Sequence, residues 1–170
     1  MQYDPIKQSL GKTFNKKPFL RILFYKLLDL LLLRAWHIKR ELRQLRKTLP
    51  SELNILDAGS GFGQYSYALV KKFKNAHITG VDVKEEQIED CNQFFSSIGL
   101  SERVDFQKAD LTQFNKKNIY DLILSVDVME HIEDDVAVFK NFHAAMKDNA
   151  VLLISTPSDQ GGSDVHDDHE

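Results

Sequence analysis

The chain has 170 residues and a mass of 19.6 kDa, which predicts one globular domain. Hydrophobic residues make up 42% and charged residues 28%, a composition that excludes disordered, collagen-like and disulfide-scaffold proteins. The single cysteine, Cys91, cannot form an internal disulfide, so we expect a reducing, cytoplasmic location.

The net charge of −3 hides two oppositely charged parts. Residues 1–50 contain twelve Lys and Arg but three Asp and Glu, a net charge of +9, whereas residues 51–170 carry a net charge of −12. An acidic body repels phosphates, so we predict no nucleic-acid partner. We therefore expect an N-terminal helical arm (1–50), an α/β domain (51–157) and an acidic tail (158–170) that forms a loop or is disordered.

The arm begins with an apolar run, residues 18–38, that predicts helix. A membrane span needs about 20 nearly uncharged residues. This run is interrupted by Arg21, Lys26, Asp29 and Arg34, so we predict that it does not cross a membrane.

A second helix is predicted between Ala35 and Pro50, because apolar residues recur there at steps of three and four. We expect the arm helices to pack on the body and cover its ligand cleft. Peripheral contact of this basic, leucine-rich arm with an anionic membrane surface is the alternative, and both can hold at once.

Between residues 51 and 157, short apolar segments alternate with helical patterns. This alternation predicts a doubly wound α/β fold with a mainly parallel sheet, whose ligands bind beyond the carboxyl ends of the strands. The expected strands are 54–58, 77–82, 103–107, 120–126 and 150–155, and the expected helices between them are 64–73, 84–98 and 134–147.

Four aspartates end or follow the first four expected strands: Asp57, Asp82, Asp110 and Asp127. Parallel strands bring them to one edge of the sheet. Carboxylates gathered there repel one another, so we expect a ligand with hydroxyls, an amine or a positive charge. Four solvated turn residues are the alternative.

A glycine-rich segment, residues 59–63 (GSGFG), joins the first expected strand to a helix. Its glycines allow a tight turn and close approach of the backbone to a ligand. The dinucleotide motif G-x-G-x-x-G requires glycine at position 64, where this chain has Gln64. A nucleotide-dependent oxidoreductase is therefore disfavoured.

These motifs together resemble those of the class I S-adenosylmethionine-dependent methyltransferases, over residues 55 to 157. Residues 57–63 (DAGSGFG) match the family's acidic-x-G-x-G-x-G pattern. The resemblance implies a Rossmann-like fold, S-adenosylmethionine as cofactor and methyl transfer to a small acceptor. We expect the acceptor to be lipophilic, because the arm that would cover the cleft is apolar. The resemblance also implies that the cofactor contacts Asp57, Gly59, Ser60, Gly61 and Gly63.

Three further segments carry the resemblance. Asp82 matches the acid that binds the ribose hydroxyls, with Val83 beside the adenine. Asp110 and Leu111 match the pair that reads the adenine edge through a carboxylate and a backbone amide. Residues 125–131, beginning with Ser125, match the segment that lines the methionine end of the cofactor.

Methyl transfer mainly requires that donor and acceptor be aligned and water excluded. A base is needed only where the acceptor must lose a proton, and His131 is the first candidate and Glu130 the second. A structural role for His131 at a helix start is the alternative. A cofactor-binding regulatory or interaction module without catalysis is the alternative to an enzyme.

The carboxyl end departs from the family pattern. The family's sheet usually has seven strands, and this chain ends just after the fifth expected strand, so we expect the last two to be missing from it. Residues 158–170 contain His166 and His169 among aspartates but lack metal-ligand spacing, and we predict no metal site. The sequence carries no prediction of oligomeric state.

Overall fold

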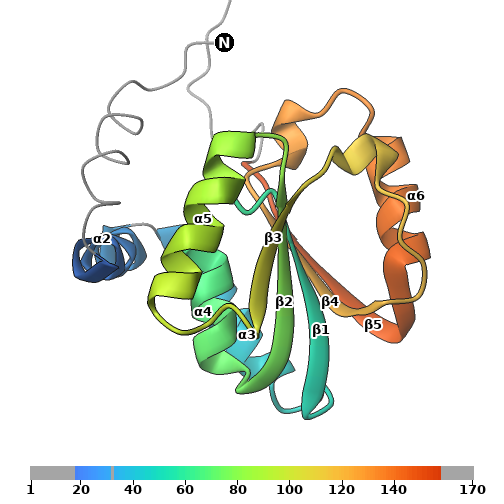
Figure 1. The fold of residues 1–170 in the computed structure, drawn as a ribbon. Coiled ribbons are helices and arrows are strands. Elements are labelled where there is room, and N and C mark those ends of the chain that lie inside the picture. The colour runs from blue at the N-terminus through green and yellow to red at the C-terminus, as the bar shows by residue number, and fades with distance from the viewer. Residues whose placement is uncertain (1–17, 32, 158–170) are drawn as a thin grey trace, which may run out of the picture.

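The computed structural model describes residues 18–157 except residue 32 (Figure 1). The predicted acidic tail, with His166 and His169, lies outside the described residues. In chain order the elements are α2 (Pro18–Leu31), α3 (Leu33–Leu45), β1 (Glu52–Ala58), α4 (Gln64–Lys72), β2 (Asn75–Asp82), α5 (Glu85–Ser97), β3 (Val104–Lys108), η1 (Leu111–Gln113), β4 (Tyr120–Val126), η2 (Met129–His131), α6 (Asp135–Ala145) and β5 (Met146–Ser155).

The five strands form one parallel sheet in the order β3-β2-β1-β4-β5. The chain fills one side of β1 with β2 and β3, and then crosses to the other side to add β4 and β5. This reversal makes the β1–β4 boundary the topological switch point, where such sheets bind ligands. The predicted doubly wound fold is therefore confirmed.

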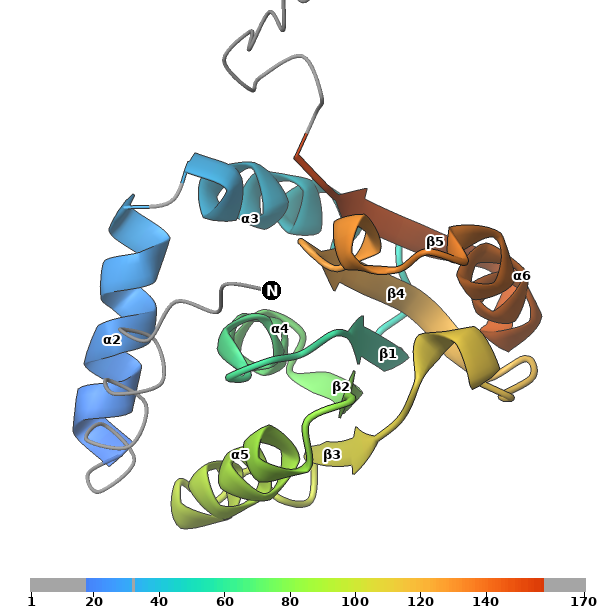
Figure 2. The same cartoon turned by 90° about the horizontal axis from the view of Figure 1, so that it is seen from above.

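Helices cover both faces of the sheet, and each face has its own apolar core. Figure 2 shows α4 and α5 on one face and α6 on the other. The first core includes Phe94 and Phe95 from α5 and Phe106 from β3, whose rings meet at centroid distances of 5.2 and 5.0 Å. The second core joins Val138 and Phe142 of α6 to Leu56 and Ile123 of the sheet.

The N-terminal arm belongs to the first core. Tyr25 of α2 and Ile38 and Leu42 of α3 are each less than 5% exposed and pack in the same cluster as Leu69 of α4. The expectation that the arm packs on the body is therefore confirmed for the described part. No helix in the described part of the chain is both long and apolar enough to span a bilayer.

The boundary between α6 and β5 was predicted wrongly. The helix expected over 134–147 ends at Ala145, and the strand expected from residue 150 begins at Met146. Met146 pairs with Tyr120, after which the register shifts so that Val151 pairs with Leu122. Asn149 takes a left-handed φ of 62° in this irregular stretch. The residues of this irregular stretch are mostly polar and lack the apolar run of a strand, so the sequence pattern assigned them to the end of the preceding helix and the loop after it.

Candidate functional site

The candidate site is the edge of the sheet formed by the carboxyl ends of the strands, around residues 59–63, here called the glycine loop. The N–H groups of Gly59 and Ser60 both donate to the Val81 carbonyl, at 2.8 and 2.9 Å. The Gly63 N–H donates to the Ser60 carbonyl at 2.8 Å. These bonds fold the loop back over the end of β2, directly before α4 begins.

Two glycines of the loop are required for different reasons. A Cβ at Gly59 would overlap the Val128 side chain, which follows β4. Gly61 has a φ of +50°, and no heavy atom lies within 4 Å of the position that its Cβ would take. The glycine at position 59 therefore permits internal packing, whereas Gly61 leaves open space above a backbone that a ligand can approach.

Asp82 is held beside this open space by the backbone. Its Oδ2 accepts a hydrogen bond from the Gly61 N–H at 3.0 Å, and its Oδ1 accepts one from the Lys84 N–H at 3.0 Å. A carboxylate has about four acceptor positions, so both oxygens can accept further hydrogen bonds. The group is thus oriented to bind a ligand that carries hydroxyl donors.

Asp57 is placed beneath the loop rather than at its surface. It is 2% exposed, and its Oδ2 accepts from the Ser66 hydroxyl at 2.5 Å. Burial raises the pKa of Asp57 from its ordinary value of 3.8 to about 6, while the hydrogen bonds from Ser66 oppose this rise. Asp57 is therefore not a permanent surface charge.

On the β3 side of the edge, Asp110 caps a short helix. Its Oδ1 accepts from the Thr112 N–H at 2.9 Å and from the Thr112 hydroxyl at 2.7 Å. Leu111 buries its side chain in the second core, and Val83 after β2 is 59% exposed. The edge between β2 and β3 therefore combines a fixed carboxylate with an exposed apolar side chain.

Asp127, the fourth aspartate, faces the arm. It has a φ of 55° and forms an ion pair with Arg34 of α3. Asp82 and Asp110 are held by N–H or hydroxyl donors and Asp57 is buried, so each carboxylate has a partner within the protein. Repulsion among them therefore does not by itself require a ligand, whereas the sequence argument expected one with hydroxyls, an amine or a positive charge.

Two buried hydroxyls at this edge have unmet hydrogen-bonding capacity. The Oγ atoms of Ser60 in the loop and Ser125 near the end of β4 have no partner among the described residues. Both residues are less than 7% exposed. Buried polar groups are normally hydrogen-bonded, so these two hydroxyls fit a site that binds a polar ligand.

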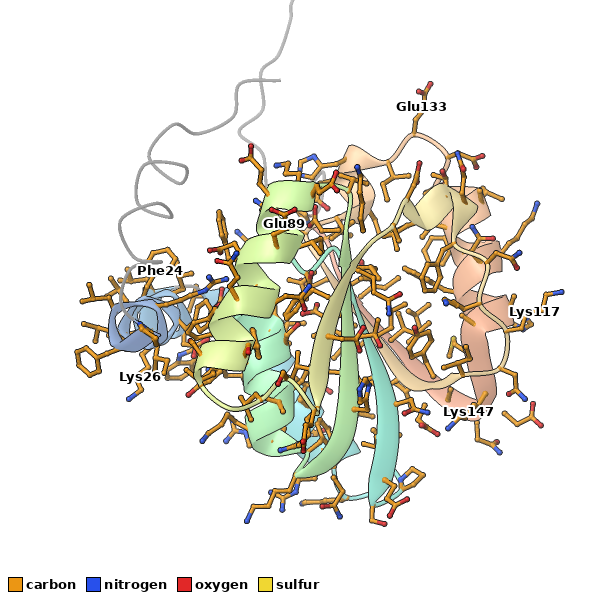
Figure 3. All side chains as sticks on the ribbon, viewed as in Figure 1. Phe24, Lys26, Glu89, Lys117, Glu133 and Lys147 are labelled. Carbon is orange, nitrogen blue, oxygen red and sulfur yellow. The ribbon has the colours of Figure 1, made fainter. Side chains whose placement is uncertain are left out.

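Glu130 and His131 lie on η2, in the segment that follows β4, and both are exposed. The Glu130 carboxylate accepts a weak hydrogen bond from the Thr156 hydroxyl at 3.4 Å. Figure 3 shows Glu133, two residues further on, at the upper end of the molecule, whereas Lys147 lies toward the opposite end. Both candidate bases are thus open to solvent, and their role remains a prediction.

Three residues of α2 and α5 that were not predicted as site residues also contact the glycine loop. Arg21 and Tyr25 of α2 donate to the Phe62 carbonyl, and Cys91 of α5 donates to the Gly61 carbonyl at 3.4 Å. The one feature of the sequence that could have indicated these contacts is a charged residue, Arg21, inside an apolar run. No cluster of metal-ligating side chains occurs within the described residues.

The comparisons with known proteins agree with this geometry. The model of the methyltransferase domain family matches residues 49–170, and the chain belongs to this family. Phosphoethanolamine N-methyltransferase 1 of Arabidopsis thaliana is 34% identical over 66% of this chain and 26% of its own. (S)-tetrahydroprotoberberine N-methyltransferase of Eschscholzia californica is 30% identical over 59% of this chain and 28% of its own.

The fold matches solved structures as well. Phosphoethanolamine N-methyltransferase 2 of Haemonchus contortus, solved in complex with S-adenosyl-L-methionine, aligns with a TM-score of 0.62 at 21% identity. The alignment covers 70% of this chain and 27% of that structure. The chain thus spans less than a third of the length of each of these three proteins.

Proposed function

We propose that this chain forms the cofactor-binding domain of an S-adenosylmethionine-dependent methyltransferase that acts on a small, lipophilic acceptor. The observation that carries the proposal is the Asp82 carboxylate, fixed by Gly61 and Lys84 beside the glycine loop. A ribose presents adjacent hydroxyl donors, and an oriented carboxylate is the group that binds them. Membership of the methyltransferase domain family supports the same cofactor.

The remaining residues of the edge fit the rest of the cofactor. The open space above Gly61 lets the cofactor approach the loop closely, and the unpartnered hydroxyls of Ser60 and Ser125 can bind the polar groups of its methionine part. The backbone of Gly59 and Gly63 shapes the loop around it. Asp57 beneath the loop becomes a full negative charge above pH about 6, which favours a cationic ligand.

The edge between β2 and β3 suits the adenine. Val83 offers an exposed apolar side chain, Asp110 a carboxylate and Leu111 a backbone amide. When bound, S-adenosylmethionine supplies an electrophilic methyl group on a sulfonium. The work of this chain is to orient donor and acceptor and to exclude water.

We propose His131 as the general base, with Glu130 as the second candidate, for an acceptor that must lose a proton. Both lie on η2 next to the carboxyl end of β4 and are exposed, so an acceptor at this edge can reach them. Histidine is the side chain that most often acts as a general base.

The arm is proposed to cover the site. Arg34 of α3 pairs with Asp127 after β4, and Asp29 of α2 accepts from the Gln64 amide at 3.0 Å. Gln64 is the first residue of α4, directly after the glycine loop. These contacts join the arm to both sides of the switch point, which supports its role in excluding water from the methyl transfer.

The outer face of the arm supports a second proposal, contact with an anionic membrane. Figure 3 shows Lys26 projecting from α2, and Arg40 and Arg43 of α3 are also exposed. Basic residues next to exposed apolar side chains suit the surface of an anionic bilayer. The exposed apolar side chains of the arm are Phe19, Leu23, Leu27, Leu30, Leu31, Leu33 and Trp36.

Calorimetric titration with S-adenosylmethionine tests the proposed function, with NADH as the comparison ligand. We expect binding of the first and none of the second. Release of S-adenosylhomocysteine is then measured with phosphoethanolamine and with (S)-tetrahydroprotoberberine as trial acceptors. Tight binding of NADH alone would contradict the proposal. Cofactor binding without turnover of a broad acceptor panel would favour the non-catalytic module.

A further inference from the structure

The strongest feature outside the proposed contacts with the cofactor is a buried arginine in the arm. Arg21 of α2 is 3% exposed, and its guanidinium lies 4.5 Å from the centre of the Phe94 ring. Its Nη1 donates to Asp90 at 2.6 Å, and its Nη2 donates to the Phe62 carbonyl at 2.8 Å. One side chain thus joins the arm, α5 and the glycine loop.

Arg21 forms an ion pair with Asp90, so the positive and negative charges neutralise each other. The Asp90 side chain is 21% exposed. An ion pair of this kind adds little net stability, because the cost of removing both charges from water offsets their attraction. A screened, neutralised charge also exerts little force on a ligand at the sheet edge. What the side chain supplies is therefore a fixed set of donors, directed at chosen acceptors.

The Phe62 carbonyl accepts hydrogen bonds from two side chains of α2. Besides Arg21 Nη2, it accepts a hydrogen bond from the Tyr25 hydroxyl, and Arg21 Nε in turn donates to that hydroxyl at 2.8 Å. The preceding carbonyl, that of Gly61, accepts from Cys91 Sγ at 3.4 Å. Two consecutive peptide groups of the loop are thus held from the side of α2 and α5.

The same loop is held at Gly61 by the Asp82 carboxylate, which accepts from the Gly61 N–H. A peptide group is planar, so fixing the direction of its carbonyl also fixes the direction of the next N–H. Donors from α2 on the Phe62 carbonyl therefore determine how the Phe62–Gly63 peptide is turned. Loops rich in glycine have many alternative conformations, and these contacts select one of them.

We infer that Arg21 and Tyr25 are positioning residues that hold the glycine loop in the conformation that binds the cofactor. The inference rests on the proposed function. It gives the arm a second role besides covering the site, which is to fix the conformation of the glycine loop. Because the coupling is reciprocal, a ligand that needs this loop conformation also strengthens the docking of α2. Removing either donor lowers the affinity for S-adenosylmethionine without removing any group that touches it.

Three variants and a control test the inference. Tyr25→Phe removes one donor to the Phe62 carbonyl but keeps the ring in the core, and Arg21→Met removes the other donor. Arg21→Lys keeps the charge but loses the planar fork that reaches several acceptors. Tyr67→Phe is the matched control, because its ring packs 5.6 Å from that of Tyr25 in the same aromatic cluster.

Two measurements are made on each variant of the 170-residue chain. Calorimetry gives the affinity for S-adenosylmethionine, which we expect to fall about fivefold in Tyr25→Phe, the loss of one hydrogen bond, and tenfold or more in Arg21→Met. Arg21→Lys should not restore it. Hydrogen exchange without ligand should be faster at residues 61–63 in all three variants, and the cofactor should slow exchange in α2 of the wild type.

Wild-type affinity and wild-type exchange at residues 61–63 in Tyr25→Phe and Arg21→Met would overturn the inference. Wild-type affinity for S-adenosylmethionine in Arg21→Lys would also overturn it, because the positive charge alone would then account for the role of Arg21. The proposed function fails separately, if the wild-type protein does not bind S-adenosylmethionine. In that case the exchange rates of the unliganded variants still decide whether Arg21 and Tyr25 hold the loop.

Discussion

The Asp82 carboxylate at the end of β2 accepts a hydrogen bond from the Gly61 N–H across 3.0 Å. The bond joins two motifs that stand 21 residues apart in the chain. It places the carboxylate and the most open point of the glycine loop within one small region of the sheet edge. The two motifs therefore act as one binding element, and a change in either should be felt by the same ligand.

Replacing Asp82 by Ala should weaken binding of S-adenosylmethionine by roughly ten- to a hundredfold, because the ribose hydroxyls lose a charged acceptor worth about 1.5–3 kcal/mol. Calorimetry on both proteins measures the loss. Asp105→Ala is the control, since Asp105 lies within β3 and bonds Thr79 and Gln107 instead. Equal affinity of Asp82→Ala and the wild type would refute the role of Asp82.

Gly61→Val should abolish binding of the cofactor while the fold is kept. Valine disfavours a φ of +50°, and its side chain would occupy the open space above the loop. Gly99→Val is a matched control, because Gly99 has a φ of +71° with open space around it in the turn after α5. Circular dichroism should show similar losses of stability, about 1–2 kcal/mol, in both variants. Cofactor affinity should fall in Gly61→Val alone, and retained affinity there would show that the loop is only a turn.

Asp57→Asn should become more stable relative to the wild type as the pH rises. Because the pKa of Asp57 is raised from 3.8 to about 6 in the folded protein, its contribution favours folding below pH about 4 and is lost as the pH rises through 6. Asparagine does not titrate, so the difference in free energy of unfolding should grow by up to about 3 kcal/mol between pH 4 and 7.

Urea unfolding of both proteins across this pH range measures the difference. Ser66→Ala serves as the companion variant, because it removes the hydroxyl hydrogen bond that opposes the rise in the Asp57 pKa and keeps the one from the Ser66 backbone. It should shift the pH dependence to higher values. A difference between Asp57→Asn and the wild type that is constant from pH 4 to 7 would contradict the raised pKa.

Arg34→Ala should speed release of the cofactor if the arm covers the site. The Arg34–Asp127 pair is partly exposed, and such pairs contribute up to about 1 kcal/mol, so release should become up to about fivefold faster. Stopped-flow measurement decides this, with Arg40→Ala as the control because Arg40 pairs with Glu41 of its own helix. An unchanged rate would reject the cover. Point variants are preferred to deletion of the arm, which would also remove Ile38 and Leu42 from the core.

Binding to anionic vesicles should depend on the outer face of the arm. The double variant Leu30→Glu with Leu33→Glu adds charge to two side chains that are 70% and 79% exposed, and it should abolish sedimentation with phosphatidylglycerol vesicles at low salt. Its control is Val136→Glu with Phe139→Glu, which makes the same kind of change on α6. Salt should weaken the wild-type interaction. If the wild type does not sediment at low salt, the membrane proposal is wrong.

The sequence by itself determined the order of the strands and helices along the chain and the position of the motifs at strand ends. The alternation of apolar runs and helical patterns can be read locally. A helix that packs on the sheet must bury one apolar stripe, and a strand covered by helices must bury both faces. The aspartates could be assigned to one edge because parallel strands end together. The family resemblance added a role to Asp82 and Asp110, and their backbone and hydroxyl contacts could not be derived from spacing.

Only the tertiary structure decided what each polar side chain contacts. Asp57 is buried and Asp127 is paired with the arm, although both stand at strand ends like Asp82, because burial and partners come from segments distant in the chain. Arg21 looked like a break in an apolar helix, yet it reaches the Phe62 carbonyl 41 residues away. Local periodicity indicates which face of a helix is buried, but the partner of a buried charge depends on how the helices pack in three dimensions.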